Sequence, residues 1–274
     1  MIGAILQRHR NKAVYAAPLA PIALQSRLSC LLFATALAAA ALATAAGAQS
    51  PRGPQPDTAI VGSQVIEQTN ALRSRHGLTA VEPDANLAKA AQKFAEFMAR
   101  TERYGHEADA RRPADRAAAE GYEHCMVAEN IAYVFSSSGF TSEQLASRLV
   151  AGWWQSPGHR DNMLLAPATH TGFGVAQSER STRYYAVQLF ARPRSASTRF
   201  EVANRTDTPI RYEVDGEAFN LAIKVTRTHT RCSDATLRVL WPDDIDGTTG
   251  VRPYNGARYV VARDRSGRIS FQTN

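Results

Sequence analysis

Cysteine is scarce in this chain, with three residues among 274. No two of them form a Cys-x-x-C pair, which argues against a dithiol redox motif and a cysteine-held zinc site. Common catalytic signatures are missing as well. The sequence contains no phosphate-binding Gly-Lys-Ser/Thr loop, no His-Glu-x-x-His and no Gly-x-Ser-x-Gly. These absences argue against P-loop nucleotide chemistry, a zincin-type protease and a nucleophile elbow.

Acidic residues are outnumbered, with 25 against 32 Lys and Arg, which gives a net charge of +7 and a pI near 9.6. The excess is uneven along the chain. Residues 1–48 carry four basic residues and no acidic one, residues 49–193 carry 15 of each, and residues 194–274 carry 13 basic and 10 acidic. The central part is therefore neutral, and it has no Lys/Arg cluster interleaved with aromatic side chains. We expect no nucleic-acid partner despite the high pI.

The first 48 residues have the pattern of a secretory signal. A basic stretch ends at Arg27, and residues 28–50 carry no charge and are rich in alanine. Ala46 and Ala48 form an A-x-A cleavage pattern. We therefore predict a signal peptide over 1–48, and a secreted or periplasmic protein with no membrane span after cleavage. The alternative is a retained anchor, because an apolar run of about 20 residues can span a bilayer.

Two cysteines, Cys125 and Cys232, follow this segment. An oxidising compartment would permit a disulfide between them. The sequence leaves this bridge and two free buried thiols equally open, because it does not show whether the Cα atoms approach within about 7 Å. A bridge would connect the two domains that are predicted next.

Periodic patterns divide the rest into a linker, a mixed domain and a β domain. The Pro-rich residues 49–57 predict a linker. Strand-like runs at 172–176 and 184–191 follow several helical patterns, and this order predicts an α+β layered domain over 58–193. Apolar spacing and cap residues predict the helices at about 60–75, about 85–103, between Pro113 and Gly121, from Thr141 through Trp153, and from Ser156 to Leu165.

Period-two alternation takes over after residue 193. Short alternating runs at about 200–202, 210–214, 221–225 and 237–241 are separated by turn signals such as Asp215-Gly216 and Asn255-Gly256. We predict a small all-β domain, a sandwich or a barrel, over 198–274. Its arginine-rich strands suggest an adhesion or targeting role, although a solvated basic face is the simpler interpretation.

Two histidines and one glutamate have the most specific positions. His159 would lie in the first turn of the helix capped by Ser156, where the helix dipole disfavours the imidazolium form. Glu129 lies in the apolar run 127–135, where a carboxylate is costly unless it is paired. With His106 they would suit an open divalent-metal site that keeps a water in the remaining position. Hydrogen bonding of both histidines to Glu129 in a polar core is an alternative of equal weight.

These residues lie in a series of ordered sequence blocks. The blocks are Asn70-Ala-Leu-Arg73 with Gly77-Leu78, His106, Arg116 with Gly121-Tyr122, Ala128-Glu129-Asn130-Ile131-Ala132, Trp153 with Ser156-Pro157-Gly158-His159-Arg160-Asp161-Asn162-Met163-Leu164, Gly172-Phe-Gly-Val175, and Tyr185 with Gln188 and Phe190. In this order, over about residues 58–193, the sequence resembles bacterial members of the CAP superfamily (cysteine-rich secretory proteins, antigen 5 and pathogenesis-related proteins; the SCP domain). The resemblance implies an α-β-α sandwich with a large central cleft.

In that family the cleft holds two histidines and two acidic residues, which can bind zinc or another divalent cation. By position, His106, Glu129 and His159 correspond to three of the four and would be the metal ligands. The second acid normally follows the tryptophan by three residues, and here Ser156 stands at that spacing from Trp153. The resemblance therefore implies an incomplete tetrad with Ser156 as a cleft neighbour. Other acids could replace the missing ligand: Glu107, Asp109 or Glu143.

Two functions follow as hypotheses. The resemblance implies an exported protein whose cleft binds a small or extended ligand, with lipid or other cell-envelope material as candidates. The residues also allow a hydrolase of protease or esterase type, with His159 or Glu129 as general base, or with a cleft serine activated by a histidine. The missing fourth ligand and the absence of a serine in a nucleophile turn weigh against the hydrolase.

Overall fold

The computed structural model describes residues 53–240, 250–263, 265 and 269–273. The predicted signal peptide and residues 49–52 of the predicted linker lie outside these ranges. Among the described residues, no helix has both the length and the apolar character that crossing a membrane requires.

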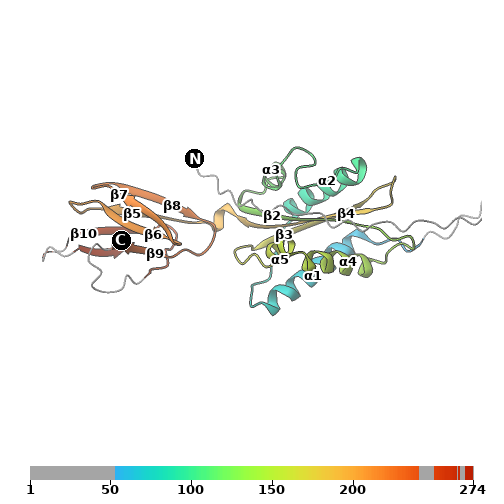
Figure 1. The fold of residues 1–274 in the computed structure, drawn as a ribbon, viewed down its shortest axis with the longest axis horizontal. Helices are drawn as coiled ribbons and strands as arrows, with labels where there is room; N and C mark the ends of the chain where they lie inside the picture. Colours follow the sequence, from blue (N-terminus) through green and yellow to red (C-terminus); the bar gives the residue numbers. More distant parts are fainter. Residues whose placement is uncertain (1–52, 241–249, 264, 266–268, 274) are drawn as a thin grey trace, which may run out of the picture. The chain divides into compact units, whose positions relative to one another are not determined.

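A four-stranded sheet forms the middle layer of the region that ends at Pro193 (Figure 1). Helices α2 and α3 cover one face of the sheet, and α1, α4 and α5 cover the other, which confirms the predicted α-β-α sandwich. The sheet order is β1-β3-β4-β2. The elements of this region are α1 (Thr58–Arg75), β1 (Glu82–Pro83), α2 (Ala85–Thr101), α3 (Pro113–Ala119), β2 (His124–Val134), α4 (Ser142–Gln155), α5 (Pro157–Met163), β3 (His170–Gln177) and β4 (Tyr184–Pro193).

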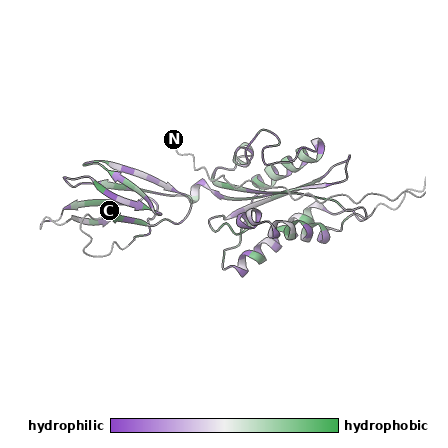
Figure 2. Cartoon of the chain, in the orientation of Figure 1, coloured by the Kyte–Doolittle hydropathy of each residue, from purple (hydrophilic) through white to green (hydrophobic). Residues whose placement is uncertain are grey.

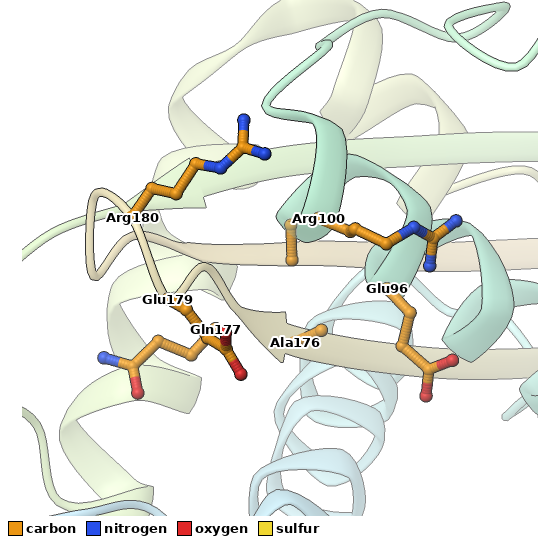
Figure 3. A pocket seen from close by; sticks show the side chains of 7 residues that line it. Glu96, Arg100, Ala176, Gln177, Glu179 and Arg180 are labelled. Carbon is orange, nitrogen blue, oxygen red and sulfur yellow. The ribbon is translucent and has the colours of Figure 1, made fainter.

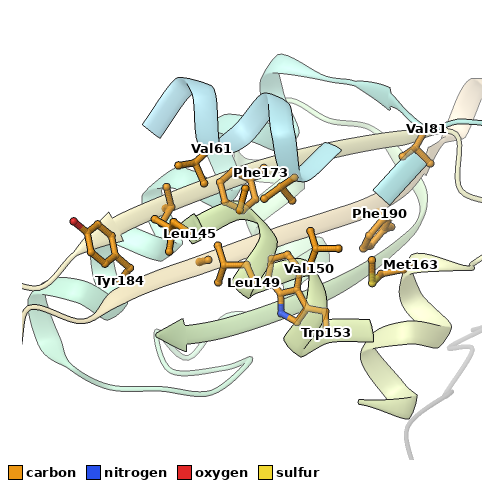
Figure 4. Close-up of a cluster of buried hydrophobic side chains, with 14 of the residues drawn as sticks. Val61, Val81, Leu145, Leu149, Val150, Trp153, Met163, Phe173, Tyr184 and Phe190 are labelled. Carbon is orange, nitrogen blue, oxygen red and sulfur yellow. The ribbon is translucent and has the colours of Figure 1, made fainter. Parts of the chain in front are cut away.

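Each face of the sheet has its own apolar core. The α4 residues Leu145, Leu149 and Trp153 repeat at helical spacing and pack with β-strand side chains in the core on the α1/α4 side (Figure 4). On the other side Leu87 and Phe94 of α2 lie in a second buried cluster. Figure 2 shows hydrophobic and hydrophilic residues alternating along the helices, as expected where one face of each helix is buried.

Glycine brings β3 unusually close to α2. A Cβ added at Gly172 would collide with the backbone of Leu87, and one at Gly174 would collide with the backbone of Gln92. The Gln92 side chain, in turn, accepts from the backbone N–H of Val175 at 3.0 Å and donates to its carbonyl at 3.2 Å. The Gly-Phe-Gly-Val block is therefore a helix–sheet contact, and its role is in packing.

Arg73 holds the segment that follows α5. Its side chain is fully buried and donates to the backbone carbonyls of Thr79, Met163, Leu165 and Ala168, at 2.8–3.2 Å. These bonds satisfy the guanidinium without a carboxylate, and they fix the C-terminal end of α5 against α1.

Strand β2 was missed by the pattern analysis, which indicated only an apolar run around Glu129. The structure makes an 11-residue strand of it, paired antiparallel with β4 over most of its length. Helices cover both faces of this strand, so its residues show no clean alternation of apolar and polar side chains. All five predicted helices are present.

Beyond Pro193 the chain forms further β-sheets, which confirms the predicted all-β character. One sheet has the order β11-β10-β5-β8 and the other β7-β6-β9, with a buried core that includes Phe200, Tyr212 and Leu237. The elements are η1 (Arg194–Ala196), β5 (Thr198–Asn204), β6 (Ile210–Val214), β7 (Glu217–Leu221), β8 (Thr226–Arg231), β9 (Leu237–Leu240), β10 (Arg258–Arg263) and β11 (Ile269–Thr273).

One predicted strand in this region is wrong. Residues 221–225 are not a strand, because β7 ends at Leu221 and β8 begins at Thr226. Asp215 and Gly216, with φ of 54° and 79°, form a turn, and β7 begins directly after it at Glu217. Strand β7 therefore begins and ends earlier in the chain than the alternation of residues 221–225 predicts. Lys224, with φ of 62°, then lies in the turn before β8.

The two remaining cysteines form a disulfide, a question that the sequence had left open. Cys125 of β2 and Cys232, just after β8, have Cα atoms 5.6 Å apart. The bridge closes a sequence separation of 107 residues and covalently joins the strand that carries Glu129 to the C-terminal β region. Closure of so long a loop stabilises the fold mainly by restricting the unfolded chain.

Candidate functional site

The candidate site lies at β2, the strand at one end of the sheet. Side chains cap the outward backbone carbonyls of this edge. Ile131 O accepts from Tyr104 Oη and from Trp153 Nε1, both at 3.1 Å, and Glu129 O accepts from Asn162 Nδ2 at 3.1 Å. An edge capped in this way is protected from pairing with another strand, so side chains rather than backbone form the surface that is offered to a ligand.

Glu129 is a buried carboxylate with two partners. Its side chain is 1% exposed, and Arg116 Nη2 lies 2.7 Å from Oε2 while His106 Nδ1 lies 2.9 Å from Oε1. Arg116 is itself almost fully buried, stacks its guanidinium 3.6 Å from the centre of the Phe94 ring, and pairs with Asp109 at 2.8 Å. The buried charge of Glu129 is therefore compensated by the Arg116 guanidinium, which is itself fixed by Phe94 and Asp109.

Arg116 also donates to two backbone carbonyls. Nη1 bonds to Arg111 O at 2.7 Å and Nη2 to His106 O at 2.9 Å. These bonds tie the loop between α2 and α3 to Glu129, and so they place His106, whose side chain is 44% exposed, over the end of the carboxylate. Arg116 is the residue that organises this half of the site.

The donors that are present do not fit a tightly held divalent ion. Both oxygens of Glu129 already have partners, and Ser156 stands where the family resemblance implies a second acid. Among the described residues no group of three or more His, Cys, Asp and Glu side chains is arranged to hold a metal. A structural or catalytic zinc site needs at least three such groups. Zinc binding by His106, Glu129 and His159 stays a prediction.

His159 lies at the third position of α5, on the other side of the β2 edge from α3. Its carbonyl accepts from Asn130 Nδ2 at 3.0 Å, and Asn162 Nδ2 donates to Asn130 Oδ1 at 3.0 Å, so the helix is fastened to β2. Burial lowers the pKa of His159 below its usual value, and the nearby His106 lowers it further. The lowered pKa favours the neutral imidazole, and its main cause is burial.

A groove of about 390 Å³ runs beside this edge. Its lining comes from Tyr104, from β2, from α4 and from the start of α5, and it includes Ser156 and His159. Tyr104 and Tyr133 are 46% and 45% exposed, and their rings meet edge to face, with centroids 5.0 Å apart. The groove therefore offers both aromatic surface and polar groups.

Tyr104 has an exposed ring but an enclosed hydroxyl. The hydroxyl donates to Ile131 O, and its burial raises the pKa of Tyr104 to about 12, with smaller contributions from Tyr133 and Glu129. The phenol is therefore protonated at any physiological pH, and it acts as a fixed wall of the groove and not as an acid or base.

The structure brings the predicted residues to one strand edge in two groups. His106 contacts Glu129 directly, while Ser156 and His159 line the groove. Of the suggested substitutes for the missing acid, Asp109 is paired with Arg116 and none lines the groove. Sequence reasoning missed Arg116 and Tyr104 as site residues. Arg116 belongs to the family blocks, and a buried glutamate is expected to have a cationic partner. Nothing in the sequence, however, indicates that Arg116 is the partner of Glu129.

A second pocket, of about 340 Å³, lies between the C-terminal half of α2 and the β3–β4 turn (Figure 3). Its charges alternate in sign, with Glu96 and Arg100 on α2 and Glu179 and Arg180 at the turn. None of the predicted site residues lines it. We place the candidate site at the β2 groove, because Ser156 and His159 line it and Glu129 belongs to the same edge strand.

Comparison with known protein families finds a match within the region that ends at Pro193. The sequence model of the cysteine-rich secretory protein family, CAP, matches residues 66–190. Residues 66–190 are a CAP domain. The matched segment begins within α1 and ends within β4, so the CAP domain contains His106, Arg116, Glu129 and His159.

Relatives of this CAP domain occur in bacteria. The uncharacterized protein YkwD of Bacillus subtilis is 29% identical over 116 residues, which are 42% of each chain, and the uncharacterized membrane protein YlbC of the same species is 30% identical over 113 residues, which are 41% of this chain and 30% of YlbC. An extracellular SCP-domain protein from Bacillus anthracis is 26% identical, with a TM-score of 0.42 over 49% of this chain and 41% of that one. The chain thus spans less than half the length of each of these relatives.

Proposed function

We propose that this is an exported CAP-domain protein whose β2 groove binds a small or extended ligand from the cell envelope. The observation that carries the proposal is the groove itself. It is about 390 Å³ in volume, within the range of about 300–1,000 Å³ that small-ligand sites occupy. Exposed Tyr104 and Tyr133 contribute aromatic surface, and Ser156 and His159 contribute polar groups. Export rests on the N-terminal sequence pattern.

Binding is favoured over metal-assisted chemistry by the state of Glu129. A general base or a metal ligand must present an oxygen to the ligand, whereas this carboxylate is 1% exposed, ion-paired with Arg116 and hydrogen-bonded to His106. The network stiffens the edge strand beneath the groove. A rigid, preformed wall lowers the entropic cost of binding, because fewer side chains have to be ordered when the ligand binds.

Gly152 of α4 supplies a sharp test. It lines the groove, it is exposed, and a Cβ at this position would meet nothing within 4 Å. Gly152→Phe should therefore fill the groove without disturbing the fold, and Gly152→Ala is the matched control. Native mass spectrometry of the exported protein, together with untargeted analysis of co-purifying small molecules and metals, should find a ligand on wild type and Gly152→Ala but not on Gly152→Phe. Equal occupancy of all three would count against the groove.

A hydrolase remains the second candidate because one observation favours it. Burial lowers the pKa of His159 and favours the neutral imidazole, and Ser156 lines the same groove. Turnover of ester or peptide substrates that disappears in both Ser156→Ala and His159→Ala would support it. Turnover that survives both changes, or no turnover with wild type, would leave binding as the function.

A further inference from the structure

We propose that the β2 groove selects an acidic oligosaccharide, a glycan that carries carboxylates in the manner of uronic acids. This inference rests on the proposed function and names the class of ligand. It combines three observations on the groove: which side chains are accessible, which charges they carry, and how the neighbouring carboxylate is neutralised.

The accessible surface of the groove is aromatic and polar. Tyr104, Tyr133, Arg148 and Gln155 are exposed. Of the larger apolar side chains of the lining, Ile131 and Leu149 are 3% and 1% exposed, Trp153 is 1% exposed, and Val134 is half-buried. A lipid chain would find little apolar wall here. Exposed tyrosine rings beside hydrogen-bonding groups suit a sugar, whose C–H faces stack on rings while its hydroxyls bond to polar side chains.

The charge of the groove is positive. No aspartate or glutamate belongs to the described residues that line it, whereas Arg148 does. A second arginine, Arg183, places its guanidinium 5.2 Å from the centre of the Tyr133 ring. One cation on the lining and one over the Tyr133 ring, without an acid among the described lining residues, favour an anionic ligand by direct attraction and by steering its approach.

The nearest buried acid does not cancel this charge. Glu129 is 1% exposed, and its charge is offset by Arg116 at 2.7 Å, with His106 on the other oxygen. Ser156 stands on the lining and contributes a hydroxyl. This group carries no charge and can hydrogen-bond to a carboxylate or a hydroxyl of a ligand.

The test compares an acidic and a neutral hexasaccharide of equal length. Isothermal titration calorimetry with the purified exported protein should show binding of hexagalacturonate and no binding of maltohexaose. Arg148→Gln should weaken the acidic ligand by about tenfold or more, because a charge-assisted contact is lost, while Arg148→Lys should keep part of it. Arg75→Gln makes the same charge change at an exposed arginine of α1 outside the groove, and it should leave binding unchanged.

The outcomes separate this inference from the proposed function. Equal binding of maltohexaose, failure of hexagalacturonate to bind, or an unchanged affinity in Arg148→Gln would each overturn the acidic-glycan inference. So would binding of phosphatidylglycerol vesicles in place of the oligouronide. In all of these cases the proposed function still stands if Gly152→Phe abolishes ligand capture, and it fails along with the inference if that variant captures as wild type does.

Discussion

The two sheet regions of this chain bury polar groups in opposite ways. In the CAP domain, Glu129, Arg116 and His106 form an ion-paired cluster at an edge strand, beside an open groove. In the C-terminal region, His229 is 5% exposed, accepts or donates a 2.7 Å hydrogen bond with Tyr212, and stacks on Phe200.

The two buried groups differ in their surroundings. His229 is enclosed by three aromatic rings, the third being that of Phe219 with its centroid 4.9 Å away. Such a residue contributes to packing, and the environment favours its neutral form. The cluster at β2 instead fixes a loop and a strand edge next to accessible side chains. A buried polar group thus marks a candidate site where it borders a groove, and it reports on stability where it does not.

The largest expected effect is at Arg116. Arg116→Met removes the cation from Glu129 and should lower the free energy of unfolding by about 3–5 kcal/mol, because a buried carboxylate is left unpaired. Urea unfolding of the purified protein measures this. The double variant Arg116→Met/Glu129→Gln removes the buried charge too and should recover much of the loss. A cost below about 1 kcal/mol for the single change would mean that the pair contributes little.

The next effect concerns the bridge that joins the two regions. Replacing both Cys125 and Cys232 by serine should cost about 2–4 kcal/mol, since the disulfide closes a long loop in the unfolded chain. Thermal unfolding of the variant should match that of wild type in reducing agent. If reduction lowers the melting temperature of the variant as well, something other than this disulfide is responsible.

The smallest expected effect is on pH dependence at His229. Burial lowers the pKa of His229 to about 4, and the charges of Arg231 and Arg227 act in the same direction. The unfolded chain then takes up a proton below about pH 6.5 that the folded chain does not, so stability is full above that pH and falls as the pH drops toward 4. By pH 5 the loss should be about 2 kcal/mol.

His229→Gln is the matched control for this effect, because glutamine offers Tyr212 a hydrogen-bond partner but does not titrate. The difference in urea stability between wild type and variant, measured from pH 7.5 down to about pH 5, isolates the histidine from other groups. A difference that stays constant across this range would contradict the lowered pKa.

Much of the CAP domain could be predicted from residue patterns. The helices were located by apolar spacing and by caps such as the Thr141 capping box, which the structure contains. His106, Glu129 and His159 were chosen from their contexts and from the family blocks, and they do lie at one strand edge. Arg116 was not chosen, because it meets Glu129 through the packing of α3 against β2, and no sequence spacing encodes that contact.

The C-terminal region was harder to predict in detail. Its β character followed from period-two alternation, yet residues 221–225 were placed in a strand. The Asp215-Gly216 turn determines where β7 begins and how it pairs with β6. The alternation of apolar residues over 221–225 does not contain this information. The disulfide between Cys125 and Cys232 could not be predicted from the sequence either, because it depends on the Cα separation in the folded chain.

The sequence by itself determined the class of fold and the residues with specific contexts, because these depend on local periodicity, caps and residue identity. The tertiary structure decided the state of those residues. Glu129 is paired with Arg116 because two segments 13 positions apart meet at the sheet face. His159 lines a groove without carboxylates because α4 and α5 meet the β2 edge there. Charge and accessibility depend on neighbours in space, and those neighbours exist only after folding.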